Sequence, residues 1–332
     1  MRTVLCDRLG IELPIIQAPM GGAAGPALAA AVSNAGGLGM LAPWRLDSAG
    51  LRQQIRQTRA LTDRPFGVNF VIAFPQEERL DICLEEGVTI VSSFWGNPEA
   101  FAARAHAGGA TTVFHTIAGA DEARRAVDCG VDVVVAQGWE AGGHVWGSVA
   151  TLPLIPAVVD AVGPVTPVVA AGGIADGRGL AAALCLGATG GWIGTRFLAS
   201  EEAAVHPRYK ELLFGAQETT TIHTGLFDIG WPDAPHRVLR NSTVETWETA
   251  GRPAPGSRPG EGDLVAASAS RGPIERYRSY TPAPDASGDI EALSLWAGQG
   301  VGLVKHAQPA GSIVQQIADE ARAILRSVQQ LA

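Results

Sequence analysis

The sequence predicts an α/β fold, a (β/α)8 TIM barrel with a C-terminal lid subdomain, and three observations support that prediction. Short apolar runs alternate eight times with segments of helical composition within about the first 215 residues, as a closed parallel barrel requires. Near-continuous apolar runs such as residues 133–136 are typical of strands buried on both faces. Glycine follows several helical segments within one or two residues, where a left-handed C-cap forms. An open doubly wound sheet is the competing architecture.

The individual elements are expected at the following positions. The expected strands cover residues 14–19, 37–42, 66–70, 88–93, 112–115, 131–136, 167–171 and 191–195. The expected helices cover residues 26–34, 49–61, 76–86, 98–107, 121–129, 152–161, 178–186 and 201–213. Glycine C-caps are expected at Gly36, Gly87, Gly108, Gly130, Gly163 and Gly187. Asp121 and Asp176 are expected N-caps, because a short carboxylate side chain accepts from free N–H groups there.

The alternation of strands and helices stops near Gly215. Residues 231–289 are rich in Pro, Gly, Ser and Thr, show no clean periodicity, and include a predicted loop at residues 252–256. Aromatic residues interrupt this region, so we expect it to pack on the barrel rather than to form a flexible linker; they are Trp231, Trp247, Tyr277, Tyr280 and Trp296. An amphipathic helix is expected over residues 312–331. We therefore expect a barrel over residues 1–214, a substrate-covering lid over 215–308 and a helix over 309–332 that packs back on the barrel.

Composition excludes several functional classes. Of the 332 residues, 46% are hydrophobic and 17% charged, which argues against disorder. The net charge is -8 and the basic residues are scattered, so no nucleic acid partner is expected. No run of about 18 apolar residues predicts a membrane span. The four cysteines, Cys6, Cys83, Cys129 and Cys185, are far apart, and neither they nor the histidines have metal-ligand spacing, so no metal site is expected. Isolated thiols suit a reducing compartment, so we expect a cytoplasmic protein. We expect it to be either a monomer or a homodimer.

Two glycine-rich turns follow the last two expected strands. Gly172 and Gly173 lie after the seventh strand and precede a helix, while Gly194 and Thr195 end the eighth. Consecutive glycines let the backbone approach an anion closely, and a helix N-terminus supplies free N–H groups. Because TIM barrels commonly bind phosphate between these two loops, the sequence predicts a phosphate site there.

Polar and small residues also end the first and third strands. Ala18, Pro19 and Met20 follow strand one, and Asn69 ends strand three. Backbone donors and an amide side chain suit the edge of a flat ring, although Met20 suits a core position equally well.

The candidate catalytic residue is His144. It lies on a glycine-rich loop, residues 137–147, which follows the sixth strand and therefore reaches the catalytic face of a barrel. Histidine exchanges a proton near neutral pH, so His144 is the candidate general base. His115 ends the fifth strand, where a role in the site and a structural hydrogen bond are both open. The remaining histidines have no convincing partners in the sequence.

Together, these segments resemble the nitronate monooxygenase family, formerly called 2-nitropropane dioxygenases. The matching segments are residues 14–20, 35–39, 67–69, 140–144, 171–176, 194–198 and 296–300. The resemblance implies FMN as cofactor and oxidation of alkyl nitronates, or of nitroalkanes, by molecular oxygen to a carbonyl compound and nitrite. It also implies that His144 is catalytic. It implies flavin contacts from Ala18, Pro19, Met20, Asn69, Gln137, Gly142, Gly143, Gly172, Gly173, Gly194 and Thr195.

The resemblance leaves one departure and one alternative. Family members often have a lysine beside the histidine of strand five, whereas Thr116 stands there in this chain, so a direct charge contact to the flavin from this strand is in doubt. The alternative is a flavin-dependent enoyl-acyl-carrier-protein reductase, which would use NADH or NADPH and a thioester. That class shares the fold and a similar Gly-Gly-His loop.

Overall fold

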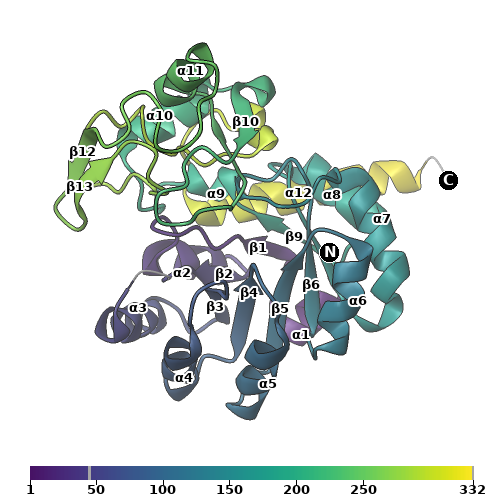
Figure 1. Cartoon of the computed structure of the whole chain (residues 1–332). Coiled ribbons are helices and arrows are strands. Elements are labelled where there is room, and N and C mark those ends of the chain that lie inside the picture. The colour runs from purple at the N-terminus through teal and green to yellow at the C-terminus, as the bar shows by residue number, and fades with distance from the viewer. Residues whose placement is uncertain (44–45, 331–332) are drawn as a thin grey trace.

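The computed structural model describes residues 1–43 and 46–330, and within them eight parallel strands form a barrel (Figure 1). Their order is β1-β9-β8-β6-β5-β4-β3-β2. Leu38 N donates to Ile15 O at 2.9 Å and Gln17 N donates to Leu38 O at 3.0 Å, which closes the sheet between its first and last strands. The strands are β1 Ile15–Gln17, β2 Gly39–Leu41, β3 Phe66–Val71, β4 Ile90–Phe94, β5 Thr112–Ile117, β6 Val133–Gln137, β8 Val168–Ala171 and β9 Gly190–Ile193. The predicted barrel is confirmed, and the open sheet is wrong.

Helices surround the barrel on its outer face (Figure 1). They are α2 Pro26–Asn34, α3 Ser48–Leu61, α4 Glu77–Glu85, α5 Glu99–Ala107, α6 Ala120–Asp128, α7 Thr151–Val162 and α8 Gly177–Cys185. By contrast, α1 Val4–Leu9 lies at the N-terminal ends of the strands, where Leu5, Cys6 and Leu9 join the cluster inside the barrel. After β9 follow a short helix, α9 Thr195–Leu198, and α10 Pro207–Gly215. The predicted helix over residues 201–213 was therefore wrong in its first half, because Pro207, with its fixed φ, sets the first turn of α10.

The predicted helix caps were only partly right. Asp176 Oδ1 accepts from Arg178 N at 2.9 Å and from Gly179 N at 3.2 Å, which confirms it as the N-cap of α8. Asp121 lies within the first turn of α6, whose N-cap is Gly119, so that prediction was wrong. The confirmed glycine caps have φ between +71° and +95°; they are Gly36, Gly87, Gly130 and Gly187. Gly108 and Gly163 keep negative φ, so those two predictions were wrong, and Gly109 takes the left-handed conformation after α5.

Alternate strand residues fill the barrel interior. Ile16, Phe114 and Val169 are fully buried in one cluster inside the barrel. Since residues i and i+2 of a strand share a face, Thr116 continues the inward face of β5 beyond Phe114, whereas His115 lies on the opposite face. The packed interior therefore ends below the C-terminal ends of the strands, where the next inward residues can line a cavity.

The segment after α10 contains regular structure that the sequence did not predict. Two three-stranded sheets form there, in the orders β10-β11-β7 and β13-β12-β14. Their strands are β7 Gly143–His144, β10 Thr221–Thr224, β11 His236–Leu239, β12 Leu264–Ser268, β13 Gly272–Glu275 and β14 Ala286–Gly288, and α11 covers Ser242–Thr249. Residues 252–256 form a loop, as predicted. Figure 1 shows this segment, in green, above one end of the barrel.

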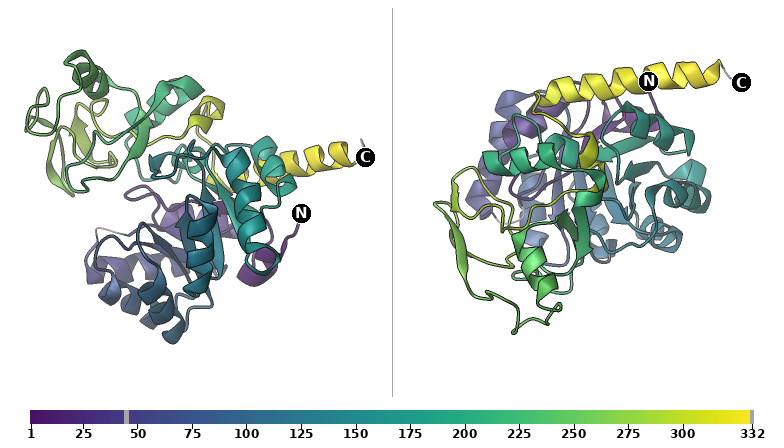
Figure 2. Two further views of the ribbon diagram at one scale, coloured as in Figure 1. Left: turned by 45° about the vertical axis from the view of Figure 1, so that its right-hand side comes forward. Right: turned by 90° about the horizontal axis from the view of Figure 1, so that it is seen from above.

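The last helix, α12 Ala310–Gln329, packs on α8 and α2. Glu320 Oε2 accepts from Gly177 N at 2.9 Å, and Gln315 Nε2 donates to Ala35 O at 2.8 Å. The view from above in Figure 2 shows α12 running along one side of the barrel. The predicted helix over 312–331 is thus confirmed up to Gln329, whereas Gln330 is the C-cap and residue 331 lies outside the described residues. Within the described chain, no helix combines the length and the apolar character needed to cross a lipid bilayer.

Candidate active site

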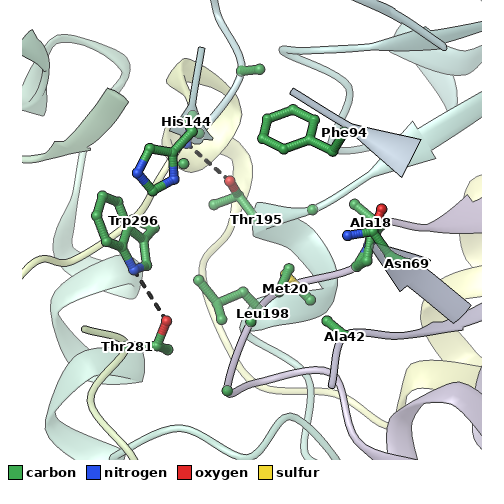
Figure 3. Close-up of a pocket in the computed structure, with 18 of the residues that line it drawn as sticks. Ala18, Met20, Ala42, Asn69, Phe94, His144, Thr195, Leu198, Thr281 and Trp296 are labelled. Carbon is green, nitrogen blue, oxygen red and sulfur yellow. Dashed lines mark hydrogen bonds between the residues drawn. The ribbon is translucent and has the colours of Figure 1, made fainter. Parts of the chain in front are cut away.

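A cavity of about 550 Å³ lies at the C-terminal ends of the barrel strands. Its wall includes every candidate residue that the sequence singled out, namely Ala18, Pro19, Met20, Asn69, Gln137, Gly142, Gly143, His144, Gly172, Gly173, Gly194 and Thr195. The segment above the barrel completes the wall with Trp231, Ser270, Arg271, Ser279, Tyr280, Thr281, Ala283 and Trp296. Figure 3 shows His144 and Trp296 side by side, with Met20, Ala18 and Asn69 on barrel segments across the cavity. The structure therefore brings together residues that are up to 278 positions apart, from Ala18 to Trp296.

The two glycine turns form a tightly packed backbone surface. Gly172 and Gly173 have φ of +108° and +70°, a conformation that L side chains rarely adopt. A Cβ on Gly172 would lie 2.8 Å from Thr151 Oγ1, so no side chain fits there without a shift. On the neighbouring turn, Thr195 Oγ1 accepts from Gly298 N at 3.0 Å (Figure 3). Backbone N–H groups of such turns can hold an anion such as a phosphate. The first N–H groups of α8 itself are not free for this purpose, because Glu320 and Asp176 accept from them.

Glu140 ties the loop after β6 to the glycine turn after β8. Its carboxylate accepts from Thr151 N at 2.8 Å and from Thr151 Oγ1 at 2.9 Å. Thr151 Oγ1 also lies 3.1 Å from Gly172 O. From above, the buried guanidinium of Arg237 donates to Trp139 O at 2.8 Å. The loop that carries His144 is therefore held from below and from above before any ligand binds.

The side chain of His144 lies among aromatic rings. Its ring is stacked on Trp231, with centroids 4.1 Å apart and an interplanar angle of 29°, and lies 5.2 Å from the ring of Trp296. Trp296 is itself fixed, because its Nε1 donates to Thr281 Oγ1 at 3.1 Å (Figure 3). Gln137 Nε2 donates to His144 O at 3.2 Å. These contacts orient the imidazole at the cavity wall.

A second histidine, His236, lies behind His144 and was missed by the sequence analysis. The two residues are register partners in the β11–β7 pair, and their ring centroids are 5.5 Å apart. Phe227 N donates to His236 Nε2 at 3.2 Å, so Nδ1 carries the proton and donates to Ala234 O at 2.8 Å. Complete burial lowers the pKa of His236 from 6.5 to about 4, so it stays neutral near pH 7. No motif marks it, because β11 is a four-residue strand within a Pro- and Gly-rich segment.

His115 is a structural residue outside the cavity wall. Its Nδ1 lies 2.8 Å from Ser93 Oγ on the neighbouring strand, and the ring is buried. Burial lowers the pKa of His115 from 6.5 to about 4. The next residue, Thr116, lines the cavity instead. Of the two roles left open for His115, the structure supports the hydrogen-bonded one.

The cavity fits a flavin on its own geometry. Gln137 Oε1 is buried and has no hydrogen-bond partner within the described residues, so it is an acceptor suited to a ring N–H. Asn69 Oδ1 accepts from Ser92 Oγ at 2.7 Å, which leaves its NH2 group as a donor. The glycine turns offer a cradle for a phosphate at the end of a side chain. Within the described residues, no group of three or more His, Cys, Asp or Glu could hold a metal ion.

Comparisons with known proteins agree with this arrangement. The family model described as nitronate monooxygenase matches residues 2–78 and 70–320. A Mycobacterium tuberculosis protein, (3aS,4S,5R,7aS)-5-hydroxy-7a-methyl-1-oxo-octahydro-1H-indene-4-carboxyl-CoA dehydrogenase, is 42% identical over 254 residues, which cover 76% of this chain and 70% of that protein. Nitronate monooxygenase of Paraburkholderia phytofirmans is 31% identical and covers 100% of this chain and 98% of its own. The structure of FabK from Thermotoga maritima superposes with a TM-score of 0.87 at 35% identity, covering 100% of both chains.

Proposed function

Since this chain belongs to the nitronate monooxygenase family and is a flavin-dependent oxidoreductase, we propose that it oxidises alkyl nitronates, and nitroalkanes, with molecular oxygen. The products are a carbonyl compound and nitrite. The observation that carries this proposal is the position of His144, on the wall of the cavity that fits a flavin. A proton acceptor there can reach a substrate bound above the flavin ring.

FMN is the proposed form of the flavin. One phosphate cradle, made by the glycine turns after β8 and β9, matches a single terminal phosphate. Ala18, Pro19, Met20 and Asn69 would contact the ring, while Gln137 and the glycines would hold the rest of the cofactor. The chemistry that a bound flavin supplies is the transfer of electrons from the substrate to molecular oxygen.

His144 and its neighbours carry the part of the reaction that belongs to the protein. His144 would take the proton from the carbon next to the nitro group of a nitroalkane, or donate a hydrogen bond to a nitronate. Trp231 and Trp296 keep the imidazole in place and exclude water from its faces. We also propose that residues 1–214 form the cofactor-binding part, residues 215–308 the cover, and residues 309–332 a C-terminal helix that packs back on the barrel.

A second candidate is oxidoreduction of an acyl thioester with NADH or NADPH. The observation that favours it is the 42% identity of this chain with the Mycobacterium tuberculosis protein described above, a carboxyl-CoA dehydrogenase. Both candidates use the same cavity, and they differ in the electron donor and in the substrate.

One set of assays separates the two candidates. The purified protein is first examined for the visible absorption spectrum of a flavin, and the released cofactor is identified by mass as FMN. Oxygen uptake with propionate 3-nitronate is then compared with NADH consumption with an enoyl thioester. Oxygen uptake with the nitronate and no NADH consumption supports the nitronate reaction. NADH consumption with the thioester and no oxygen uptake rejects the nitronate reaction and supports the thioester reaction.

A further inference from the structure

The rim of the cavity carries one unusual charge. Among the described residues that line the cavity, Arg271 alone has a permanently charged side chain. It is exposed at the turn between β12 and β13. No ion pair within the described part of the chain includes it. By contrast, Arg278, three residues after the end of β13, pairs with Glu275 at 2.9 Å.

The turn that presents Arg271 is held in a fixed shape. Asp285 Oδ2 accepts from Ser270 N at 2.8 Å, and Oδ1 accepts from Ser268 Oγ at 2.9 Å. These hydrogen bonds, first of all the one from the Ser270 backbone, lower the pKa of Asp285 and keep it ionised. The carboxylate of Asp285 is thus used to brace the turn, and no ion pair of the described residues occupies the guanidinium donors of Arg271.

The position of Arg271 separates it from the proposed phosphate cradle. The cradle precedes α8, and Figures 1 and 2 show the β12–β13 hairpin and α8 on opposite sides of the molecule. From the β2–α3 side of the barrel, Leu46 and Gln54 line the same cavity. Gln54 Oε1 is buried and has no hydrogen-bond partner in the described part of the chain. The cavity wall therefore offers a hydrogen-bond acceptor at Gln54 in addition to the guanidinium of Arg271.

The cavity wall near His144 is aromatic. Phe94, Trp231 and Trp296 line it, and the rings of Phe94 and Trp231 are in edge-to-face contact, with centroids 6.4 Å apart. A ligand that reaches from His144 to Arg271 therefore passes an apolar wall and ends beside a cation. A substrate with that order of groups would match the cavity along its length.

Resting on the proposed function, we propose that Arg271 determines specificity by binding an oxyanion at the end of the substrate remote from His144. The substrate class is an oxidisable carbon, an apolar middle and a terminal carboxylate or phosphate. Guanidinium groups recognise both of these oxyanions with paired N–H donors.

The test uses the full-length protein with its flavin and two matched substrate pairs. Propionate 3-nitronate, which carries a remote carboxylate, is compared with propyl-1-nitronate, which lacks it, and an enoyl-CoA, which carries phosphates, is compared with the same acyl group on N-acetylcysteamine. Arg271→Gln lowers the ratio of kcat/KM for the member with the remote oxyanion over the member without it roughly threefold to tenfold, as expected for one exposed charged contact. Arg271→Lys retains most of the ratio, and added salt weakens it. Arg125→Gln, which removes an exposed arginine from α6, is the matched control and leaves the ratio unchanged.

A binding measurement keeps the inference separate from the proposed function. Propionate is titrated into wild type and Arg271→Gln, and tryptophan fluorescence reports occupancy of the cavity. Weaker propionate binding in the variant supports the inference whether or not the nitronates are turned over. Failure to turn over either nitronate rejects only the proposed function. An unchanged substrate ratio together with unchanged propionate binding overturns the inference and leaves the proposed function standing. If Arg271→Gln lowers the kcat/KM ratio only for the nitronate pair, the group that Arg271 binds is a carboxylate. If it lowers the ratio only for the CoA pair, the group is a phosphate.

Discussion

The imidazole of His144 is stacked on the indole of Trp231, with ring centroids 4.1 Å apart and planes inclined by 29°. The two residues are 87 positions apart and come from different parts of the fold, a barrel loop and the cover. The stack makes the cover part of the candidate catalytic site.

Trp231→Leu removes the flat surface against which the imidazole lies. We expect kcat/KM for the nitronate to fall about tenfold, because a misplaced catalytic group loses much of its effect while flavin binding is kept. Trp247→Leu is the matched control, since Trp247 is an indole of the cover that does not line the cavity. Equal losses in both variants would mean that Trp231 only supports the cover.

His144→Asn keeps a polar side chain but removes the proton acceptor. We expect the flavin to stay bound and kcat/KM for a neutral nitroalkane to fall by about 10²- to 10⁴-fold, while a preformed nitronate is affected less. Steady-state oxygen uptake with both substrates provides the comparison. Unchanged turnover of the nitroalkane would reject the role assigned to His144.

Gly172→Ala places a Cβ where the backbone has a φ of +108° and where Thr151 Oγ1 would lie 2.8 Å away. We expect the Kd for FMN to rise at least about tenfold, because the turn must shift to relieve a strain of order 1 kcal/mol or more. Gly215→Ala is the control, since among the described residues no atom outside its own helical turn lies within 4 Å of the added Cβ. FMN fluorescence titration measures both. Equal affinity in wild type and Gly172→Ala would exclude this turn from the cradle.

His236 makes stability depend on pH. Its pKa is about 4 in the folded protein, against an ordinary value of 6.5, because burial disfavours the charged form. As pH falls from 6.5 to 4, the unfolded chain takes up a proton that the folded chain does not, so stability decreases through that window and is retained above it. This residue should cost about 2 kcal/mol of unfolding free energy between pH 7 and pH 5.

His236→Gln therefore should lower stability at pH 7 but lose less on acidification. Urea unfolding at both pH values measures the difference. The exposed His306→Asn serves as the control, with the pH dependence of wild type. If His236→Gln loses as much stability as wild type between pH 7 and pH 5, then His236 is not the source of the dependence.

The barrel was predictable because each of its elements has a local signal. Buried parallel strands give apolar runs, and Asp176 caps α8 as its position between the glycine-rich turn and the expected helix indicated. Asp121 and Gly108 failed because an acidic residue is equally common within a first helical turn, and because the left-handed residue can come one position later, as Gly109 does.

The cover was not predictable in the same way. Its strands are three to five residues long and pair with distant segments, so their periodicity is too short to detect. For the same reason His236 looked unremarkable, although its partner across the sheet, His144, had been found from its loop. The sequence could identify the candidate catalytic group but not the residues that surround it.

The pairing of β7 with β11 couples two events that could otherwise be independent. Because Gly143 and His144 form a strand of the sheet to which His236 and Arg237 belong, the cover cannot lift without breaking that pairing or carrying the imidazole away from the barrel. The motion that would admit a new substrate would then also carry the proton acceptor away from the barrel. A protein built in this way would be unable to take a proton from a substrate while the cover stands open.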